Sequence, residues 1–396
     1  WSSNYWLDKK LIKVKKKGLK TISIHDGELV DNEFKGAISP LYMSTVYDYM
    51  GDNQMPYPRY FNTPNQINLS KKIASLENCE KGLLFGSGIA AIFASMFTFL
   101  KSGDHVVLQS SLYGGTINLV QKEFDKFKID YSLVESLDLD DFEQMIKKNT
   151  KIIYVETPSN PLLEIIDLEK VSLLAKKHKL ISIIDNTFAS PVNQNPREFG
   201  IDIIIHSATK YLGGHSDILA GAIASSKKII DKIIESSINY GGNLSAFTAW
   251  MLERSIKTLP LRVKAQNENA LRLAKFLENN PNISKVNYPG LVNHPQHKIA
   301  KKQMKGFGGM LSFVLKKENQ VNVFPKLLNI IKPGGSLGGI ESTITSPSIT
   351  SHAKMSRDLR LKYGISDGLL RFSVGIENYE DLELDLYQAL NKIWRN

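Results

Sequence analysis

Between residues 65 and 225, short uninterrupted hydrophobic runs alternate with longer stretches in which hydrophobic residues recur every three or four positions. Runs that are apolar throughout are typical of strands buried on both faces, as in a parallel sheet covered by helices. The longer stretches have the spacing of amphipathic helices, and we expect helices over 65–78, 89–100 and 168–178. The pattern therefore predicts an α/β domain with a mainly parallel sheet. The expected strands are 82–85, 105–109, 151–156, 180–185, 201–206 and 220–225.

The two ends of the chain have different patterns. Residues 1 to about 60 mix lysine-rich, turn-rich and aromatic pieces with Pro40, Pro56 and Pro58, which predicts an extended arm. After a glycine-containing loop, a helical pattern runs from 246 to 279 and is expected to lead into a second, smaller domain. In that domain we expect strands at 309–315 and 370–375 and a closing helix at 381–393. The predicted boundaries are 1–60 for the arm, 61–255 for the large domain and 256–396 for the small domain.

Composition places the chain among well-packed globular proteins. It has 396 residues, of which 42% are hydrophobic and 23% charged, enough for two or three domains. No hydrophobic run is long enough to span a bilayer. Cys79 is the single cysteine, so an internal disulfide is excluded and a reducing compartment, the cytoplasm, is expected.

The formal net charge of +10 is a feature of many nucleic-acid-binding proteins. Residues 1–20 alone hold seven lysines and one aspartate, a contribution of +6, which leaves +4 for the other 376 residues. The basic charge is thus concentrated in one tail rather than on a binding face. We expect this tail to be a disordered extension. The non-enzyme alternative is that the chain is a basic nucleic-acid-binding protein.

A lysine follows one of the predicted strands in an informative setting. Lys210 comes four residues after strand 201–206, with the hydroxyls of Ser207 and Thr209 before it and two glycines soon after it. A lysine amine near a strand end is suited to form a Schiff base with an aldehyde, and the two hydroxyls could hold a phosphate beside it. The segment therefore predicts a pyridoxal-phosphate enzyme in which Lys210 binds the cofactor.

Pyridoxal phosphate also needs an acid for its pyridine nitrogen, donors for its phosphate and a ring on which to stack. Asp185 ends strand 180–185 and could supply the acid, although a strand-end aspartate can also simply cap a turn. Gly88 and Ile89 begin a predicted helix, where free N–H groups and the helix dipole attract phosphate, although Gly-Ser-Gly is also an ordinary turn. Tyr113 could stack on the pyridine ring or be a surface aromatic residue.

Arg371 lies within a hydrophobic strand pattern, where an unpaired guanidinium is costly. We therefore predict that Arg371 binds the carboxylate of a substrate. The alternative is an ion pair between Arg371 and a nearby glutamate. Other chemistries find no support in the sequence. The eight histidines form no metal-ligand grouping, one cysteine cannot form a thiolate cluster, and neither a Gly-x-Ser-x-Gly motif nor a nucleoside-triphosphate loop occurs. No metal site is predicted.

At these residues the sequence resembles the pyridoxal-phosphate enzymes of cysteine and methionine metabolism, the transsulfuration family. The likeness runs from about residue 36 to the C-terminus, and its motifs together, in this order, are highly specific. The chain departs from the family pattern at Asn62-Thr63-Pro64 and after Glu341, and its first 20 residues have no counterpart. The segments that carry the likeness are 57–59 (Tyr-Pro-Arg), 85–89 (Phe-Gly-Ser-Gly-Ile), 156–161 (Glu-Thr-Pro-Ser-Asn-Pro), 185–188 (Asp-Asn-Thr-Phe), 207–215 (Ser-Ala-Thr-Lys-Tyr-Leu-Gly-Gly-His), 336–341 (Ser-Leu-Gly-Gly-Ile-Glu) and 371–375 (Arg-Phe-Ser-Val-Gly).

The resemblance implies the aspartate aminotransferase-like, type I fold of pyridoxal-phosphate-dependent transferases, with a mainly parallel seven-stranded sheet domain and a smaller C-terminal α/β domain. It also implies a homotetramer, a dimer of dimers, in which the arm reaches the neighbouring subunit. By this likeness Lys210, Asp185 and Tyr113 are catalytic, with Tyr113 as the second acid or base. The implied cofactor-binding residues are Tyr57 and Arg59 of the neighbouring subunit together with Gly88, Ile89, Tyr113, Asn160, Asp185, Ser207, Thr209 and Lys210. The implied substrate-binding residues are Ser336, Glu341 and Arg371.

Two residues favour γ-type chemistry on cystathionine. By the resemblance, methionine γ-lyases carry a cysteine two residues after the stacking tyrosine, where this chain has Gly115. Glu341 resembles a glutamate that meets the distal amino group of the substrate in cystathionine γ-lyases and γ-synthases, although it could also be a solvated surface acid. We therefore expect γ-elimination or γ-replacement, with cystathionine β-lyase as the runner-up and methionine γ-lyase or O-acetylhomoserine sulfhydrylase as further alternatives.

Overall fold

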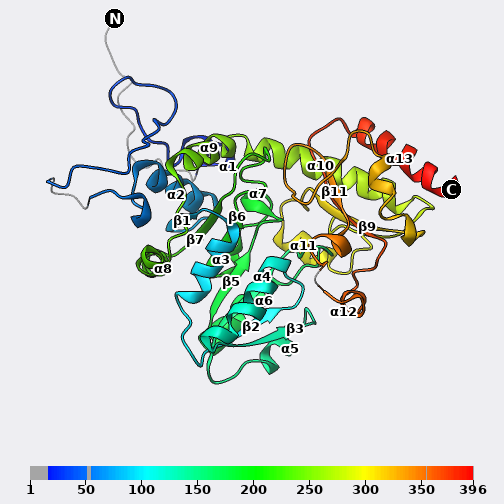
Figure 1. Ribbon diagram of the computed structural model, residues 1–396, viewed down its shortest axis with the longest axis horizontal. Helices are drawn as coiled ribbons and strands as arrows, with labels where there is room; N and C mark the ends of the chain where they lie inside the picture. The colour runs from blue at the N-terminus through cyan, green and yellow to red at the C-terminus, as the bar shows by residue number, and fades with distance from the viewer. Residues whose placement is uncertain (1–16, 51–54, 354, 396) are drawn as a thin grey trace, which may run out of the picture.

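The computed structural model describes residues 17–50, 55–353 and 355–395, and it contains a large and a small β-sheet (Figure 1). Most of the lysine-rich segment 1–20 therefore lies outside the described residues. Within the described ranges, no helix is both long enough and hydrophobic enough to cross a membrane.

The large sheet has seven strands in the order β1-β7-β6-β5-β4-β2-β3. Its neighbouring strands are parallel except at β7, which runs antiparallel to both β1 and β6. This confirms the mainly parallel sheet predicted from the uninterrupted hydrophobic runs. The hydrophobic pattern did not predict β3, an edge strand whose first two residues are exposed. The strands are β1 (Lys81–Phe85), β2 (His105–Gln109), β3 (Asp130–Val134), β4 (Thr150–Glu156), β5 (Ile181–Asp185), β6 (Ile203–Ser207) and β7 (Gly221–Ser225).

Helices cover both faces of the large sheet, as strands buried on both sides require. One face carries α3 (Gly88–Phe97), α4 (Gly114–Glu123) and α8 (Lys227–Tyr240). The other face carries α2 (Pro64–Leu76), α5 (Leu139–Gln144), α6 (Leu168–His178) and α9 (Ala246–Ile256). α6 has the bounds predicted from the sequence, because Asp167 caps its first turn by accepting from the Lys170 N–H and Lys179 ends it in the left-handed conformation.

The helical stretch predicted over 246–279 consists of two helices, α9 and α10 (Leu259–Glu278), with a short break between them. Pro260 has no N–H with which to continue α9, and it occupies the first turn of α10, where that N–H is not required. Arg262 bridges the break by donating to the carbonyl oxygens of Ser255 and Tyr211. α10 then leads into the small sheet.

The small sheet has five strands in the order β10-β11-β12-β9-β8. α10 and the closing helix α13 (Tyr379–Arg395) pack on it through residues such as Leu277 and Leu386, which surround the buried ring of Phe313. The strands predicted at 309–315 and 370–375 correspond to β9 and β12. The bounds are β8 (Ile283–Asn287), β9 (Met310–Leu315), β10 (Lys332–Pro333), β11 (Thr343–Thr345) and β12 (Leu369–Ser373), with short helices α7 (Ser190–Asn193), α11 (His297–Gln303) and α12 (Arg357–Lys362).

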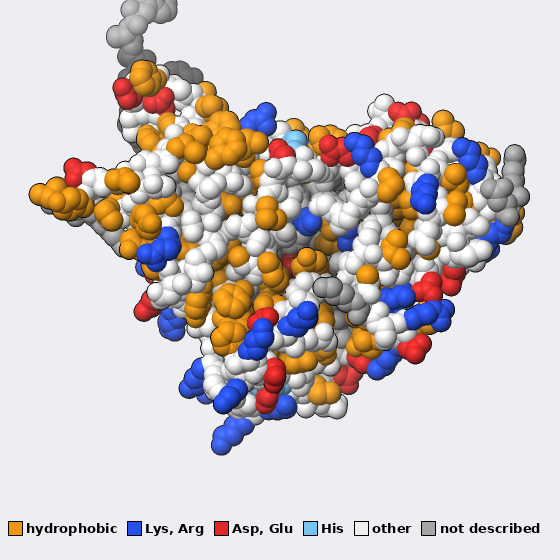
Figure 2. Space-filling model, viewed as in Figure 1, with side chains coloured by type: hydrophobic (Ala, Val, Ile, Leu, Met, Phe, Trp, Pro, Cys, Tyr) orange, Lys and Arg blue, Asp and Glu red, His pale blue; other side chains and the backbone are white. Residues whose placement is uncertain are grey.

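The N-terminal arm contains a helix, which the prediction of an extended arm did not include. α1 (Leu19–His25) packs against α2 with Ile22 buried. The buried Lys72 of α2 donates to the carbonyl oxygens of Ser23 and Ile24, each at 2.9 Å, and so holds α1 in place. Beyond α1 the arm projects from the large sheet, and hydrophobic side chains cover its tip (Figures 1 and 2). Exposed hydrophobic residues of the arm include Phe34, Val46 and Tyr49.

Candidate active site

Polar side chains gather where neighbouring strands of the large sheet end. Glu156, Asp185 and Ser207 are the last residues of β4, β5 and β6, and Glu156 and Asp185 are directly opposed in the sheet register. Because the carboxyl ends of parallel strands meet at one edge, three separate sequence segments form one site there. Asp185 and Ser207 are predicted site residues, whereas Glu156 has no role predicted from the sequence.

Lys210 lies in the turn that follows β6, where its N–H donates to the carbonyl oxygen of Ser207 at 3.1 Å. Its Nζ donates to the Ser336 hydroxyl at 2.9 Å. Burial, and then the positive charge of Arg371, lower the pKa of the Lys210 ammonium from 10.5 to about 8. Lys210 is therefore held close to the Ser336 hydroxyl. Its amine is more readily neutral, and so nucleophilic, than the amine of an exposed lysine.

The start of α3 forms a concave backbone surface beside β6. Ser87 caps the helix by accepting from the Ala90 N–H, and the N–H groups of Gly88 and Ile89 in the first turn have no intrahelical acceptor. A Cβ atom on Gly88 would lie 2.8 Å from the Cβ of Ser207, so only glycine permits this close approach. Free N–H groups, the helix dipole and the Ser207 hydroxyl together suit a phosphate group.

Thr209 is the second predicted phosphate hydroxyl, and its side chain has backbone partners. Its Oγ1 donates to the carbonyl oxygen of Ala220 at 3.1 Å and accepts from the Ala220 N–H at 3.0 Å. These two bonds join the turn that carries Lys210 to the start of β7. In this structure Thr209 thus shapes the turn. Its single O–H is already donated, so Thr209 would have to release the Ala220 carbonyl before it could donate to a phosphate.

Asp185 is buried, with 5% of its surface exposed. Its Oδ1 accepts from the Thr187 N–H at 3.0 Å, and the Thr187 hydroxyl in turn accepts from the Ser207 N–H at 2.8 Å. Burial raises the pKa of the Asp185 carboxyl, while hydrogen bonds from Thr187 and the charge of His206 act in the opposite direction. A cationic group placed against Asp185 would relieve the cost of burying its charge.

Glu156 connects the residues that the sequence placed around the cofactor ring. One of its carboxyl oxygens accepts from the Tyr113 N–H at 2.8 Å and the other from the Asn160 N–H at 3.0 Å. Burial and the neighbouring Asp185 raise the pKa of Glu156 well above its usual value. A signal for this residue existed in the sequence, because Glu156, like Asp185, is a carboxylic acid at the end of a hydrophobic strand.

Arg371 projects from β12 of the small sheet into the same site and is 4% exposed. Its guanidinium donates to Asn160 Oδ1 at 3.1 Å and to the carbonyl oxygens of Gly335 and Ser336 at 3.1 and 3.3 Å. Burial lowers the pKa of Arg371 to about 10. All three acceptors are neutral oxygens, so the predicted ion pair with a glutamate is not what holds this side chain.

A pocket of about 420 Å³ opens beside Tyr113 and Asn160. Its far wall comes from the segment around His352, whose pKa burial and the nearby Arg371 lower to about 4, so that its imidazole is neutral at physiological pH. Tyr113 is 45% exposed at the pocket. A small molecule in this pocket would contact α4 and the segments that follow β2 and β4, together with the segment between β11 and β12.

Three predicted site residues make their polar contacts outside the group around Lys210. Arg59, on the arm, donates to the carbonyl oxygen of Ile238 in α8 at 2.8 Å, and its guanidinium lies near the Tyr57 ring. Glu341 accepts from the Ser216 hydroxyl at 3.4 Å. The structure thus brings together Lys210 and the predicted residues around it, whereas Tyr57 and Arg59 have contacts on the arm and α8 instead.

The residues at the strand ends fit pyridoxal phosphate. The Lys210 amine suits its aldehyde, the buried Asp185 carboxyl suits its pyridine nitrogen, and the glycine-lined start of α3 suits its phosphate. The close approach of Gly88 to Ser207 is the geometric observation that favours this assignment, because it leaves the helix-start N–H groups accessible beside a hydroxyl.

Comparisons with known proteins agree with this site. The sequence profile described as "Cys/Met metabolism PLP-dependent enzyme" matches residues 20–391. A cystathionine β-lyase of Lactococcus lactis is 44% identical over 94% of this chain and 99% of its own length. A cystathionine γ-lyase of Bacillus subtilis is 43% identical over the same shares. The crystal structure of cystathionine γ-lyase from Lactobacillus plantarum complexed with L-serine has a TM-score of 0.92 and 38% identity, covering 96% of this chain and 100% of the other.

The matched profile spans nearly the whole described chain, and the two curated relatives exceed 40% identity over almost their full lengths. These matches, with the strand-end lysine and aspartate, confirm the family, the type I fold and the cofactor expected from the sequence. The chain belongs to the pyridoxal-phosphate-dependent enzymes of cysteine and methionine metabolism.

Proposed function

We propose that the enzyme makes or breaks carbon–sulfur bonds of cystathionine-type amino acids, with elimination or replacement at the γ-carbon as its main reaction. The observation that carries this proposal is the position of Lys210 Nζ. It donates to the Ser336 hydroxyl, and burial and the nearby positive charge of Arg371 lower its pKa. A carboxylate bound by Arg371 would place the α-carbon of an amino acid next to this amine.

When bound, pyridoxal phosphate supplies an electron sink for the charge left on the α-carbon after proton loss. Lys210 is placed to take that proton, because its amine is near neutrality at a pKa of about 8. Asp185 keeps the pyridine nitrogen protonated. Tyr113, which lines the pocket, would move the second proton, at the β-carbon, that γ-chemistry requires.

Arg371 and Ser336 bind the substrate carboxylate in this proposal. The guanidinium is already held by Asn160 and two backbone carbonyls, so it reaches the substrate with little loss of conformational freedom. Glu156 fixes the backbone of Tyr113 and Asn160 and is a positioning residue. The phosphate would be held by the N–H groups of Gly88 and Ile89 with the Ser207 hydroxyl, and by Thr209 once its O–H leaves the Ala220 carbonyl.

Gly115 supports the preference for cystathionine over methionine. A Cβ atom at residue 115 would lie 2.3 Å from Cε1 of the Tyr113 ring, so a cysteine there would force the ring to move. A chain with a larger residue at position 115 could not place its tyrosine ring where the Tyr113 ring lies here. Glu341, which is partly buried near the turn that carries Lys210, could accept a hydrogen bond from a distal ammonium group.

Cystathionine β-lyase activity is the second candidate, because the Lactococcus lactis β-lyase and the Bacillus subtilis γ-lyase are almost equally similar to this chain. Product analysis separates the two reactions. With cystathionine and water, γ-cleavage gives cysteine, 2-oxobutyrate and ammonia, whereas β-cleavage gives homocysteine, pyruvate and ammonia. Assays with O-acylhomoserine plus cysteine, O-acylhomoserine plus sulfide, and methionine complete the set. Methionine as the best substrate would overturn the argument from Gly115.

The assembly we propose is a homotetramer in which the arm completes the site of a neighbouring subunit. Tyr57 and Arg59 would reach the cofactor phosphate of that neighbour. The exposed hydrophobic side chains at the arm tip support an intersubunit role, because such surface is usually buried in a partner (Figure 2). Analytical ultracentrifugation and an Arg59→Ala variant test this arrangement, since that variant should lose cofactor affinity only if the arm reaches a cofactor.

We further propose the domain boundaries 61–255 and 256–396, with residues 1–60 as the intersubunit arm. The break between α9 and α10 after Ile256 supports the boundary at 255. We place the enzyme in the cytoplasm, in keeping with a single cysteine whose burial raises its pKa to about 12. Limited proteolysis and cell fractionation test these two proposals.

A further inference from the structure

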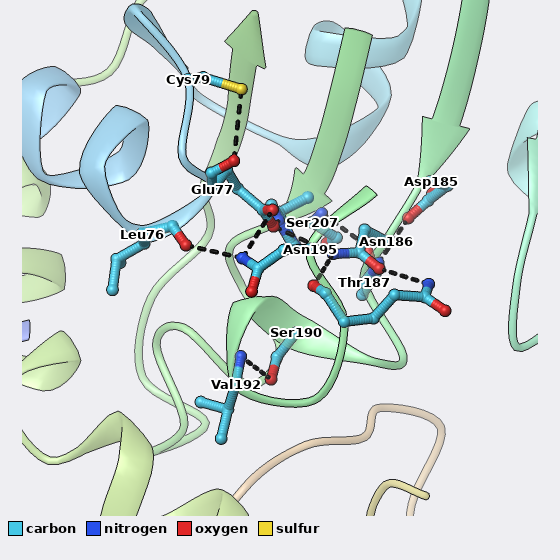
Figure 3. Close-up of polar contacts among 12 residues, drawn as sticks. Leu76, Glu77, Cys79, Asp185, Asn186, Thr187, Ser190, Val192, Asn195 and Ser207 are labelled. Atoms are coloured by element: carbon cyan, nitrogen blue, oxygen red, sulfur yellow. Dashed lines mark hydrogen bonds and ion pairs between the residues drawn. The ribbon is translucent and has the colours of Figure 1, made fainter. Parts of the chain in front are cut away.

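A buried polar network lies behind the strand end that carries Asp185 (Figure 3). Its centre is Glu77, the residue at the end of α2, which has no exposed surface. Glu77 Oε1 lies 2.5 Å from Nε2 of His206 and accepts from Asn186 Nδ2 at 3.0 Å. Glu77 Oε2 accepts from Asn195 Nδ2 at 3.5 Å. None of these four residues has a role in the site described above.

The donors around Glu77 favour its ionised form. Amide N–H₂ groups donate to both of its carboxyl oxygens, which suits an ionised carboxylate. An isolated carboxylate is costly to bury, and His206 is the ionisable group in contact with it. The His206 side chain is 2% exposed, so the pair is removed from solvent. A protonated His206 would balance that charge.

Other titratable groups that face the network leave this balance intact. Cys79 donates to the Glu77 carbonyl oxygen, and burial raises its pKa to about 12, so its thiol is neutral. Lys305 donates to Asn195 Oδ1, but its side chain is 63% exposed and screened by water. Lys305 also lies 4.0 Å from the Glu198 carboxylate, and Arg197 and Glu80 act on Cys79 with opposite charges. On the site side of the sheet, the charged neighbour is Asp185.

The sheet register places the Glu77–His206 pair directly behind Asp185. Asp185 of β5 is opposed by Ile205 of β6, and His206 is the next residue, so its side chain points to the opposite face. Asn186, which follows Asp185, links the two faces, because its N–H donates to the Ile205 carbonyl and its side chain to Glu77. The imidazole charge also favours the ionised form of Asp185, which burial alone disfavours.

We propose that Glu77 and His206 form a positioning pair for Asp185, in which a protonated His206 behind the strand end favours the carboxylate form that a pyridine nitrogen requires. This inference rests on the proposed role of Asp185. It orders four charges in alternation across the sheet: Glu77 negative, His206 positive, Asp185 negative and the cofactor nitrogen positive. Glu77 and His206 lie on the face of the sheet opposite Asp185, so both would act through Asp185.

The test measures cofactor binding and colour in Glu77→Gln, His206→Gln and the double variant. One readout is the dissociation constant of pyridoxal phosphate for the cofactor-free protein. The other is the pH midpoint of the visible absorbance of the loaded protein, which rises when the pyridine nitrogen loses its positive charge. His105→Gln is the matched control, because His105 is equally buried and hydrogen-bonded to Thr150 and Ser132 but lies at the amino end of β2.

The variants should differ in a defined order. Glu77→Gln removes both charges of the pair and should weaken cofactor binding about tenfold, equal to about 1.4 kcal/mol. His206→Gln leaves the Glu77 carboxylate unpaired near Asp185 and should weaken binding more, by about thirtyfold. The double variant should return to the level of Glu77→Gln, because the second change removes that unpaired charge. The absorbance midpoint should rise in the same order.

Several outcomes would overturn the inference: folded Glu77→Gln and His206→Gln proteins with wild-type affinity and midpoint, a double variant weaker than His206→Gln, or an equal effect of His105→Gln. If Glu77→Gln alone does not fold, the comparison of His206→Gln with the double variant still decides. Asp185→Asn separates this inference from the proposed function. An unchanged midpoint in Asp185→Asn would refute the role of Asp185, whereas a change there without one in the pair variants would refute only the pair.

Discussion

The Nζ atom of Lys210 lies 2.9 Å from the hydroxyl oxygen of Ser336. Lys210 follows β6 of the large sheet, and Ser336 lies between β10 and β11 of the small sheet. Arg371 of β12 holds the carbonyl oxygen of Ser336, so the small sheet presents a fixed hydroxyl to the reactive amine. The reactive centre therefore depends on how the two sheets pack against each other.

Replacing Ser336 with alanine should weaken substrate binding more than turnover. The hydroxyl is lost as a donor to the substrate carboxylate, and hydrogen bonds to charged groups contribute about 1.5–3 kcal/mol. We expect kcat/KM for cystathionine to fall about tenfold or more, mostly through KM. Ser284→Ala is the control, since Ser284 is an exposed residue of β8 in the same sheet. A larger loss in kcat than in KM would contradict a binding role.

Arg371→Lys should nearly abolish productive substrate binding although it keeps the positive charge. A lysine cannot donate at once to Asn160, Gly335 and Ser336 in the geometry of the planar guanidinium. We expect kcat/KM to fall about a hundredfold, measured with cystathionine at saturating cofactor. The visible spectrum of the loaded protein should stay close to wild type. Loss of the cofactor itself would mean that Arg371 holds the site together rather than binding substrate.

Cofactor capture by the cofactor-free protein should depend on pH with a midpoint at about 8, the pKa of Lys210. Burial, followed by the charge of Arg371, lowers that pKa, so the reactive neutral amine dominates above pH 8 rather than above 10.5. Stopped-flow absorbance between pH 7 and 10 avoids the phosphate titration, which has its pKa near about 6. Arg371→Gln should move the midpoint upward. A wild-type midpoint near that of free lysine would contradict the burial argument.

Gly88→Ala should weaken cofactor binding because the new methyl group has no space. It would lie 2.8 Å from Ser207 Cβ and 3.0 Å from Ser207 Cα, so α3 would have to shift away from β6. Overpacking of this kind costs about 1–3 kcal/mol, and a comparable loss of cofactor affinity is expected. Gly86→Ala is the matched control two residues earlier, where the methyl group would make ordinary contacts at 3.6 Å. Equal effects of both substitutions on the dissociation constant would contradict the role of the helix start.

Motifs at strand ends were predictable because short-range sequence determines them. The helix start at Gly88, the terminal Asp185 of β5 and the turn to Lys210 each follow from a local pattern of hydrophobic run, polar residue and glycine. Glu156 was missed although it satisfies the same pattern. Its partners Tyr113 and Asn160 are 43 and 4 residues away, and only their shared position at the strand ends shows why the carboxyl matters.

Local sequence was sufficient to predict the mainly parallel sheet, the family and the position of Lys210 after a strand end, because hydrophobic periodicity and closely spaced motifs are local properties of the chain. The contacts of Ser336 with Lys210, of Glu156 with Tyr113 and of Glu77 with His206 depend on the folded chain, since these residues are separated by 126, 43 and 129 positions. Such contacts arise from the order of the strands and from the packing between the two sheets. Neither can be predicted from the sequence of a single segment.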